Sequence, residues 1–227
     1  RTGFGITAED DMLAAMGLTY GTDEATAFAV EVQKTLACSA YRSSALMARD
    51  RGAFPLYDYK LAENNPFIQR LKSADEELYS LMKQYGRRNI ALLTIAPTGS
   101  VSICTQTSSG IEPAFLVSYR RRRKVNPNDS EATISFTDEE GQAWEEYNVL
   151  HHKFAVWAEI NGYNVADLVH KYTDEQLQEV IAKSPYNNAT ANCVNWVNKV
   201  KMQGAIQKWV DHSISVTVNL PNDVDEE

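Results

Sequence analysis

The stretch Ile-Ala-Leu-Leu-Thr-Ile-Ala-Pro-Thr-Gly-Ser-Val-Ser-Ile at residues 90–103 decides the fold class of this chain. Its first seven residues form a continuous apolar run, whose length and isoleucines favour a buried strand of a parallel sheet. Pro97 and Gly99 then turn the chain, and we expect a short helix that ends at Ser-Ser-Gly, residues 108–110. A buried strand that leads into a helix indicates an α/β protein.

The turn after this strand has the properties of a phosphate-binding site. Gly99 lets the backbone approach a ligand closely, and the free N–H groups at the start of a helix attract anions. The hydroxyls of Ser100 and Ser102 would face the same anion. The alternative is an ordinary strand–turn–helix corner with a capped helix, and these residues alone leave both interpretations open.

The rest of the sequence predicts helices that alternate with two further strands. Thr22 is a good N-cap for one long helix over residues 23–50, which ends at Gly52. Thr137 and Glu140 form a capping-box pattern before an amphipathic helix over residues 144–161. The other expected helices lie at residues 10–16, from a capping box at 73–76 to 86, from another capping box at 173–176, at 196–211 and from 222 onward, and the other expected strands at residues 3–6 and 213–220.

The composition excludes several classes of protein. The chain has 227 residues, 44% of them hydrophobic, and a net charge of −8, which argues against a general nucleic-acid binder. No apolar run is long enough to span a bilayer and no secretory signal is present, so we expect no membrane association. The three cysteines are far apart and form no C-x-x-C pair. They argue against a disulfide framework or a zinc site and favour the reducing cytoplasm.

Several polar and aromatic features have ordinary interpretations. The basic run at residues 120–124 is typical of a solvated face. His151 and His152 are neighbours on an expected helix and point to different sides, so they cannot chelate one metal ion. Asp-His-Ser at residues 211–213 alternates between the faces of an expected strand and therefore forms no catalytic triad. The tryptophans are expected in the core: Trp144, Trp157, Trp196 and Trp209.

Three ordered blocks of sequence resemble the large chain of ribonucleotide reductases. Residues 87–103, followed by Thr-Ser-Ser-Gly-Ile-Glu-Pro at 107–113, are similar to the family's strand, its P-T-G-T/S loop and its T-S-S-G-I-E-P segment. The opening block, residues 3–21, resembles the family pattern G-x-G-I/V…A-D-x-L-A-x-x-G. The closing block, residues 207–221, resembles Q-x-x-x-D-x-S-I-S-x-T-x-N-x-P. The stretch between them looks like the helical insertion of cobalamin-dependent members.

The resemblance implies a fold, and it implies that the catalytic cysteines lie outside this chain. The implied fold is the C-terminal half of a ten-stranded α/β barrel, a single domain over residues 1–227 with a helical insertion at about residues 120–205. In the family, the radical cysteine lies upstream of the first block, within an N-x-C-x-E motif that this chain lacks, so no catalytic residue is expected here. Because the chain has no initiator Met and closes on what resembles the start of a helix, we expect that it was cut from something longer or that the sequence is incomplete. The chain would then be an enzyme fragment or one half of a split enzyme. Cys38, Cys104 and Cys193 are expected to be structural, as buried thiols usually are.

The resemblance also implies a function. The complete enzyme would reduce ribonucleotides to 2′-deoxyribonucleotides by thiyl-radical chemistry, with adenosylcobalamin, a thioredoxin-type reductant and the other barrel half, which carries the catalytic cysteines. This chain would supply the loop that holds the substrate's phosphates and no metal ligand. The loop residues are Pro97, Thr98, Gly99, Ser100, Val101 and Ser102. The alternative is a catalytically inactive barrel half that binds nucleotide or scaffolds an assembly.

Overall fold

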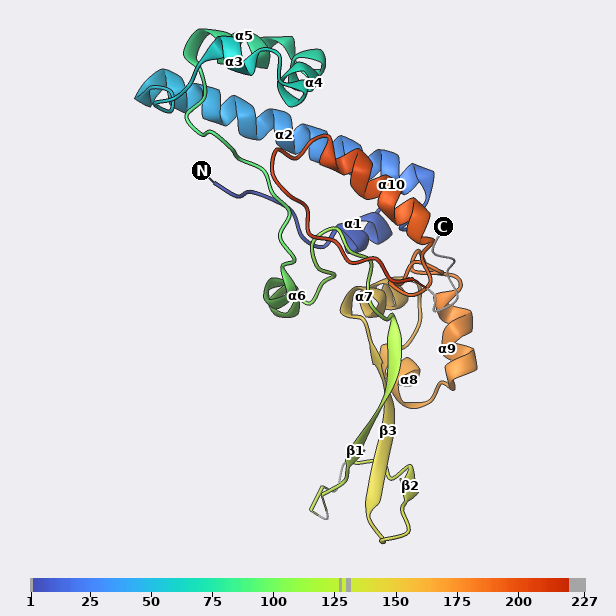
Figure 1. Cartoon of the computed structure of the whole chain (residues 1–227). Coiled ribbons are helices and arrows are strands. Elements are labelled where there is room, and N and C mark those ends of the chain that lie inside the picture. Colours follow the sequence, from blue (N-terminus) through green and yellow to red (C-terminus); the bar gives the residue numbers. More distant parts are fainter. Residues whose placement is uncertain (1, 127, 130–131, 221–227) are drawn as a thin grey trace.

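The computed structural model describes residues 2–126, 128–129 and 132–220, whose elements are labelled in Figure 1. The helices are α1 (Glu9–Ala15), α2 (Asp23–Arg51), α3 (Tyr59–Ala62), α4 (Pro66–Ala74), α5 (Glu76–Tyr85), α6 (Gly99–Thr105), α7 (His152–Ile160), α8 (Val165–His170), α9 (Asp174–Ile181) and α10 (Trp196–Gln207). The strands are β1 (Ser118–Lys124), β2 (Phe136–Thr137) and β3 (Ala143–Leu150). Among these helices, none is long and apolar enough to cross a membrane.

Helix α2 lies at the centre of the larger of two cores. The Thr22 hydroxyl accepts a hydrogen bond from the Ala25 amide (3.2 Å), and Gly52, with a φ of 77°, ends the helix. Small side chains on one face, including Ala29 and Ala37, are fully buried, so neighbouring elements approach closely. Helix α10 runs beside α2, and α4 and α5 pack on it further along (Figure 1). The predicted long helix is therefore confirmed.

Three extended segments pass through the middle of the molecule, where three strands were predicted. Phe4 pairs in parallel with Leu93, and Ile95 pairs in parallel with Ile214. The Asp211 carboxylate accepts hydrogen bonds from the amides of Leu92 (2.9 Å) and Leu93 (2.7 Å). A side chain therefore takes the place of some of the backbone–backbone hydrogen bonds that a regular sheet would have here. Among the described residues these pairings stay isolated bridges. The mixed α/β class is confirmed, and the half-barrel stays a prediction.

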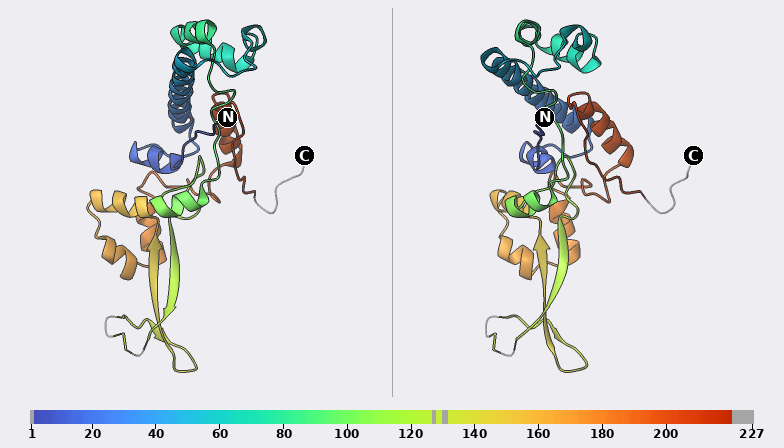
Figure 2. Two further views of the ribbon diagram at one scale, coloured as in Figure 1. Left: turned by 90° about the vertical axis from the view of Figure 1, so that its left-hand side faces the viewer. Right: turned by 60° about the vertical axis from the view of Figure 1, so that its left-hand side comes forward.

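The predicted helix over residues 144–161 is wrong in its first half. Residues 143–150 form strand β3, which pairs antiparallel with β1 from Ser118 opposite Leu150 to Lys124 opposite Trp144. The expected capping box does not form, because the Asp138 carboxylate instead accepts hydrogen bonds from the Glu140 and Gln142 amides and closes a turn before β3. Only α7, from residue 152, is helical. The β1–β3 ribbon projects from one end of the molecule, and α3–α5 lie at the other (Figure 2).

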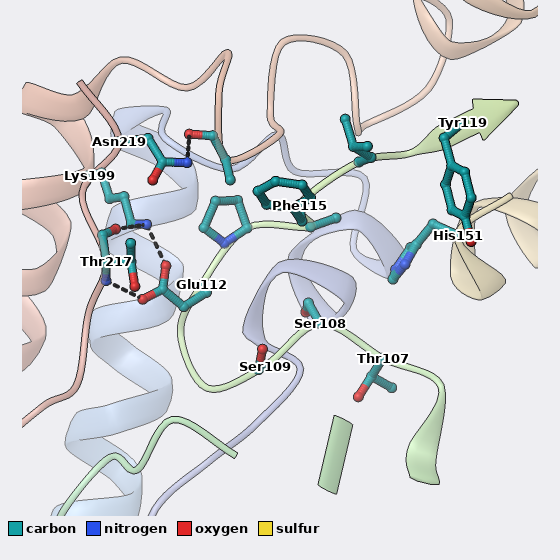
Figure 3. Close-up of a pocket in the computed structure, with 14 residues that line it drawn as sticks. Thr107, Ser108, Ser109, Glu112, Phe115, Tyr119, His151, Lys199, Thr217 and Asn219 are labelled. Carbon is teal, nitrogen blue, oxygen red and sulfur yellow. Dashed lines mark hydrogen bonds and ion pairs between the residues drawn. The ribbon is translucent and has the colours of Figure 1, made fainter. Parts of the chain in front are cut away.

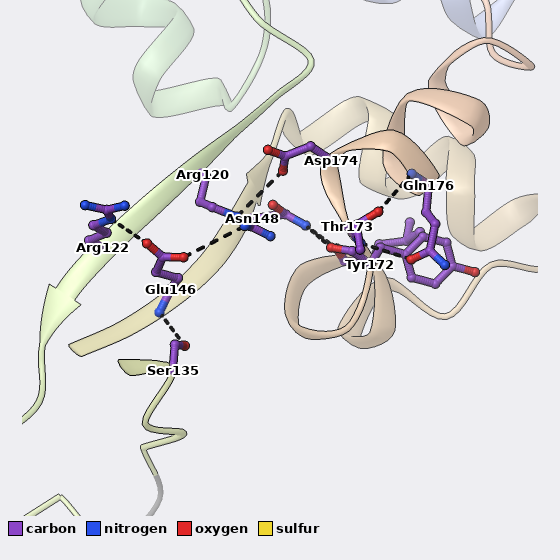
Figure 4. Close-up of polar contacts among 10 residues, drawn as sticks. Arg120, Arg122, Ser135, Glu146, Asn148, Tyr172, Thr173, Asp174 and Gln176 are labelled. Carbon is purple, nitrogen blue, oxygen red and sulfur yellow. Dashed lines mark hydrogen bonds and ion pairs between the residues drawn. The ribbon is translucent and has the colours of Figure 1, made fainter. Parts of the chain in front are cut away.

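The basic run forms most of strand β1 and is exposed, as predicted for a solvated face. Three of its four arginines nevertheless form ion pairs with acidic side chains of the ribbon or of neighbouring segments. Arg122 contacts Glu146, and Arg120 lies between Glu146 (3.8 Å) and Asp174 (3.6 Å), as Figure 4 shows. Arg123 contacts Glu145 at 2.5 Å. Such exposed pairs contribute little stability each.

The segment expected to be an insertion, at about residues 120–205, contributes most of a second core. Phe154 of α7, Leu168 of α8 and Leu177 of α9 are buried together with Tyr186, and Ala14 of α1 joins them from outside the insertion. The capping box predicted at the start of α9 is confirmed, since the Thr173 and Gln176 side chains bond each other's backbone.

Several smaller expectations need correction. Helix α5 is capped by Asp75, whose carboxylate accepts from the Leu78 amide, and not by Ser73. Helix α10 ends at Gln207 and not at residue 211. Trp196 is 39% exposed, whereas the other three tryptophans are half-buried. The helix expected from residue 222 onward lies outside the described residues.

The cysteines also differ from expectation. Cys104 and Cys193 are exposed, and only Cys38 packs against the larger core. The structural role expected of buried thiols therefore applies to Cys38 alone, where burial raises the pKa of the thiol.

Candidate phosphate-binding site

The predicted phosphate loop leads into helix α6. Of its residues, Pro97, Gly99, Ser100 and Val101 are exposed, Thr98 is half-buried and Ser102 is buried. The first helical hydrogen bond runs from the Ser102 amide to the Thr98 carbonyl (2.8 Å). The amides of Gly99, Ser100 and Val101 precede it, and none of the described residues accepts a hydrogen bond from them. The helix therefore begins with three exposed N–H donors.

Thr98, and not Gly99, has the unusual backbone conformation of this turn. Its φ is 51°, in the left-handed region, and its hydroxyl accepts a hydrogen bond from the Gly110 amide (2.8 Å) and contacts the Thr7 hydroxyl (2.9 Å). The segments that contain Thr7 and Gly110 thus hold Thr98 in this left-handed conformation. The Thr98 hydroxyl is therefore already hydrogen-bonded to other residues of this chain.

Gly99 faces open space. A methyl group added to its α-carbon would meet no atom within 4 Å, and its φ lies outside the positive region that favours glycine. The turn itself therefore tolerates a side chain at this position, and a ligand would approach the backbone freely. The Ser102 hydroxyl donates back to the Gly99 carbonyl (2.8 Å) and stabilises the helix start.

Behind the loop, the Asp11 carboxylate joins three separate parts of the chain. It accepts a hydrogen bond from the Ser108 amide (2.7 Å) on one oxygen and from the Tyr186 hydroxyl (2.8 Å) on the other. His151 Nε2 lies 2.7 Å from that second oxygen. Burial alone would raise the pKa of Asp11, but the hydrogen bond and charge of His151, with the other two donors, hold it below its usual value.

The two acids before Asp11 are buried as well. Asp10 accepts a hydrogen bond from the Ala114 amide (2.7 Å), and burial raises the pKa of Asp10 to about 7. Glu9 is 1% exposed, and neither of its carboxyl oxygens has a hydrogen-bond partner among the described residues. Burial, with the charge of Asp10, raises the pKa of Glu9 to about 8.

A cavity of about 460 Å³ lies between this acidic group and helix α10. Figure 3 shows Lys199, Glu112 and Thr217 on one side of it, and His151 with Tyr119 on the other. Lys199, 3% exposed, pairs with the Glu112 carboxylate and donates to the Thr217 carbonyl. Glu112 in turn accepts from the Thr217 amide (2.6 Å), so this side of the cavity is a closed polar network.

The structure also tests two predictions about polar residues, one for His151 and His152 and one for residues 211–213. His151 and His152 do point to different sides, since His151 contacts Asp11 and His152 is exposed. Asp211 is occupied by backbone amides and by the Tyr41 hydroxyl (2.5 Å), so residues 211–213 form no triad. Sequence reasoning missed the Asp11–His151 pair and Lys199. The local hint at Asp11 was the run of three acids at residues 9–11, but it does not distinguish Asp11 from other acids in the first turn of a helix.

The whole chain, residues 1–227, matches the family described as ribonucleotide reductase, barrel domain. The chain therefore belongs to this family, as the three sequence blocks predicted.

Its relatives include the vitamin B12-dependent ribonucleoside-diphosphate reductase of Mycobacterium tuberculosis (strain CDC 1551 / Oshkosh), 27% identical over 97% of this chain and 27% of the relative. The enzyme of the same name from Thermoplasma acidophilum is 24% identical over 100% of this chain and 25% of the relative. A ribonucleoside-diphosphate reductase subunit alpha from Treponema pallidum matches 54% of this chain at 26% identity. The chain thus spans about a quarter of the length of the vitamin B12-dependent relatives.

Proposed function

We propose that this chain is the part of a ribonucleotide reductase that binds the phosphates of the substrate. The observation that carries the proposal is the start of α6, where the amides of Gly99, Ser100 and Val101 are exposed and unpartnered among the described residues. Backbone N–H groups at a helix start are suited to phosphate oxygens. The Ser100 hydroxyl is exposed beside them and adds a donor. The Thr98 hydroxyl, already engaged with Gly110, serves to hold the loop in place.

The radical chemistry is assigned to residues outside this chain. The sequence has no N-x-C-x-E motif, and Cys104 and Cys193 are exposed and separate from any motif of that kind. We propose that a further part of the barrel supplies the thiyl radical and the cysteine pair, and that a thioredoxin-type protein reduces that pair. We place the enzyme in the cytoplasm on the cysteine pattern of the sequence.

We propose adenosylcobalamin as the cofactor of the complete enzyme, because relatives of this chain are named vitamin B12-dependent reductases. The cavity beside Lys199 holds about 460 Å³, within the range of about 300–1,000 Å³ that suits drug-sized ligands. Adenosylcobalamin is much larger than such ligands, so this cavity does not fit it. We therefore propose that the contacts to adenosylcobalamin come from elsewhere in the assembled enzyme.

We also propose that residues 1–227 act as one domain with an insertion at about residues 120–205. The small core of the insertion includes Ala14 of α1, which supports a rigid connection between the two parts. The second candidate is a catalytically inactive barrel half that binds nucleotide or scaffolds an assembly, and it would require no radical cysteine in a partner chain.

A reductase assay separates the two candidates. Formation of a deoxynucleotide is measured with adenosylcobalamin and a dithiol, for this chain alone and together with a chain that carries the missing cysteines. We expect product only from the mixture. Product from this chain alone would contradict the assignment of the radical chemistry, and no product from a correctly assembled mixture would favour the inactive candidate.

A further inference from the structure

The phosphate loop rests on the segment that follows α6. The Gly110 amide donates to the hydroxyls of both Thr98 (2.8 Å) and Thr7 (3.1 Å), and the Gly110 carbonyl accepts from the Glu9 amide (3.2 Å). Since the Thr98 carbonyl accepts the first helical bond of α6, the position of residues 108–110 determines where the exposed amides lie.

That segment is held in turn by Asp11. The Ser108 amide donates to the Asp11 carboxylate, and the Ser108 hydroxyl accepts from the Asp11 amide (3.4 Å), so the two residues are joined twice. Asp11 is 7% exposed. A buried carboxylate needs several donors to stay charged, and two of its donors come from the insertion.

His151, one of these two residues, is held by contacts of both its backbone and its ring. Its side chain is 13% exposed, and its backbone amide donates to the Val117 carbonyl (2.8 Å). Its ring meets the Tyr186 ring edge-on, with centroids 5.6 Å apart, and Tyr186 lies within the core of the insertion. The place of the imidazole is therefore set by the packing of α7 and its neighbours.

We propose that His151, acting through Asp11, is a positioning residue that fixes the phosphate loop of residues 97–102 against the insertion. The inference rests on the proposed function of that loop. The chain of contacts runs from His151 to Asp11, from Asp11 to Ser108, and from Gly110 to Thr98. The insertion thereby takes part in substrate binding without touching the substrate. The lowered pKa of Asp11 agrees with a carboxylate that stays charged at the centre of this chain of contacts.

Nucleotide binding to the assembled enzyme tests the proposal, with CDP and cytidine as the two probes. His151→Leu should raise the Kd for CDP about tenfold, equivalent to about 1.4 kcal/mol, and leave the Kd for cytidine unchanged, because only the phosphates use the loop. His151→Gln keeps an N–H donor at a similar reach and should restore CDP binding. His152→Leu, at the exposed neighbouring position, is the matched control and should bind both probes as the parent does.

Gly99→Val separates this inference from the function on which it rests. If Gly99→Val weakens CDP binding but His151→Leu does not, the positioning role is wrong and the phosphate site stands. Equal losses for CDP and cytidine in His151→Leu would make His151 a residue of general structural importance and would also overturn the inference. If neither variant changes CDP binding, the phosphate site itself is wrong.

Amide hydrogen exchange covers the case in which His151→Leu does not fold. Tyr186→Phe removes only the hydroxyl that donates to Asp11 and keeps the buried ring. The amide of Ser108 should then exchange faster, by about tenfold for the loss of about 1.4 kcal/mol of local stability. Unchanged exchange at Ser108 in Tyr186→Phe would show that the insertion does not hold the loop through Asp11.

Discussion

The buried carboxyl of Glu9 should give this protein an unusual dependence of stability on pH. In the folded chain the pKa of Glu9 is raised to about 8 from an ordinary value of 4.5, by burial and by the charge of Asp10. Between these two values the folded state holds one proton more than the unfolded state. The free energy of unfolding therefore falls by about 1.4 kcal/mol per pH unit as the pH rises through this window. Its full span is on the order of 5 kcal/mol.

Glu9→Gln removes the titrating group and should remove this slope. Between about pH 5.5 and about pH 7.5, the parent should lose about 3 kcal/mol more stability than the variant. Urea denaturation at several pH values measures the difference, because the midpoint and slope give the free energy of unfolding at each pH. Asp10, whose pKa is raised to about 7, titrates in both proteins, so the difference between the two profiles, and not the slope of either one, measures the contribution of Glu9 and its coupling to Asp10.

Glu139→Gln is the control, since Glu139 is exposed in the turn before β3. Its pH profile should follow that of the parent. If Glu9→Gln and the parent show parallel profiles over this range, Glu9 ionises normally in the folded chain. The conclusion that burial keeps the Glu9 carboxyl protonated near neutral pH would then be wrong.

Two further substitutions test other parts of the site. Lys199→Met leaves the Glu112 carboxylate without its buried partner and should destabilise the fold by about 3–5 kcal/mol in urea denaturation. The double variant with Glu112→Gln should recover much of that loss. A double variant as unstable as the single one would show that the ion pair is not the reason for the loss. Thr98→Ala removes one of the two acceptors of the Gly110 amide, the other being the Thr7 hydroxyl, and should lower the free energy of unfolding by about 0.5–1.5 kcal/mol. A parent-like denaturation midpoint in Thr98→Ala would show that this hydroxyl does not hold the turn.

The parts of the fold that sequence reasoning predicted well depend on local signals. Helix α2 has its N-cap at Thr22 and its stop at Gly52, and the corner before α6 follows from an apolar run, a proline and a glycine. Each of these signals acts within a few residues, so it can be interpreted without knowledge of the tertiary structure.

Strand β3 was missed because its signal is not local. Trp144, Tyr147 and Leu150 recur at a helical spacing, yet β3 is stabilised by its pairing with β1 and by arginine–glutamate contacts across the ribbon. The segment that supplies those partners lies about twenty residues earlier in the sequence, as for Arg123 and Glu145, 22 residues apart. Tertiary pairing therefore overrode the local periodicity.

The support behind the phosphate loop was beyond sequence reasoning for the same reason. Asp11 and His151 are 140 residues apart, and Asp11 and Tyr186 are 175 apart. Nothing in the local pattern distinguishes Asp11 from an ordinary acid in the first turn of a helix. The resemblance to the reductase family predicted which residues form the phosphate loop, whereas the contacts that hold this segment in place are visible only in the structure.

The central claim is that the start of α6 binds the substrate's phosphates, and Gly99→Val tests it most directly. Because a side chain at Gly99 would meet no atom of the chain within 4 Å, the substitution should leave the fold intact while it blocks the approach of a phosphate. Gly204→Val is the matched control, since Gly204 also faces open space but lies on α10. Calorimetry on the assembled enzyme should show that Gly99→Val weakens CDP binding by about 1–3 kcal/mol, as expected for the loss of one or two charge-assisted hydrogen bonds, while Gly204→Val binds CDP as the parent does. Parent-like CDP binding by Gly99→Val would contradict the claim and place the phosphates elsewhere.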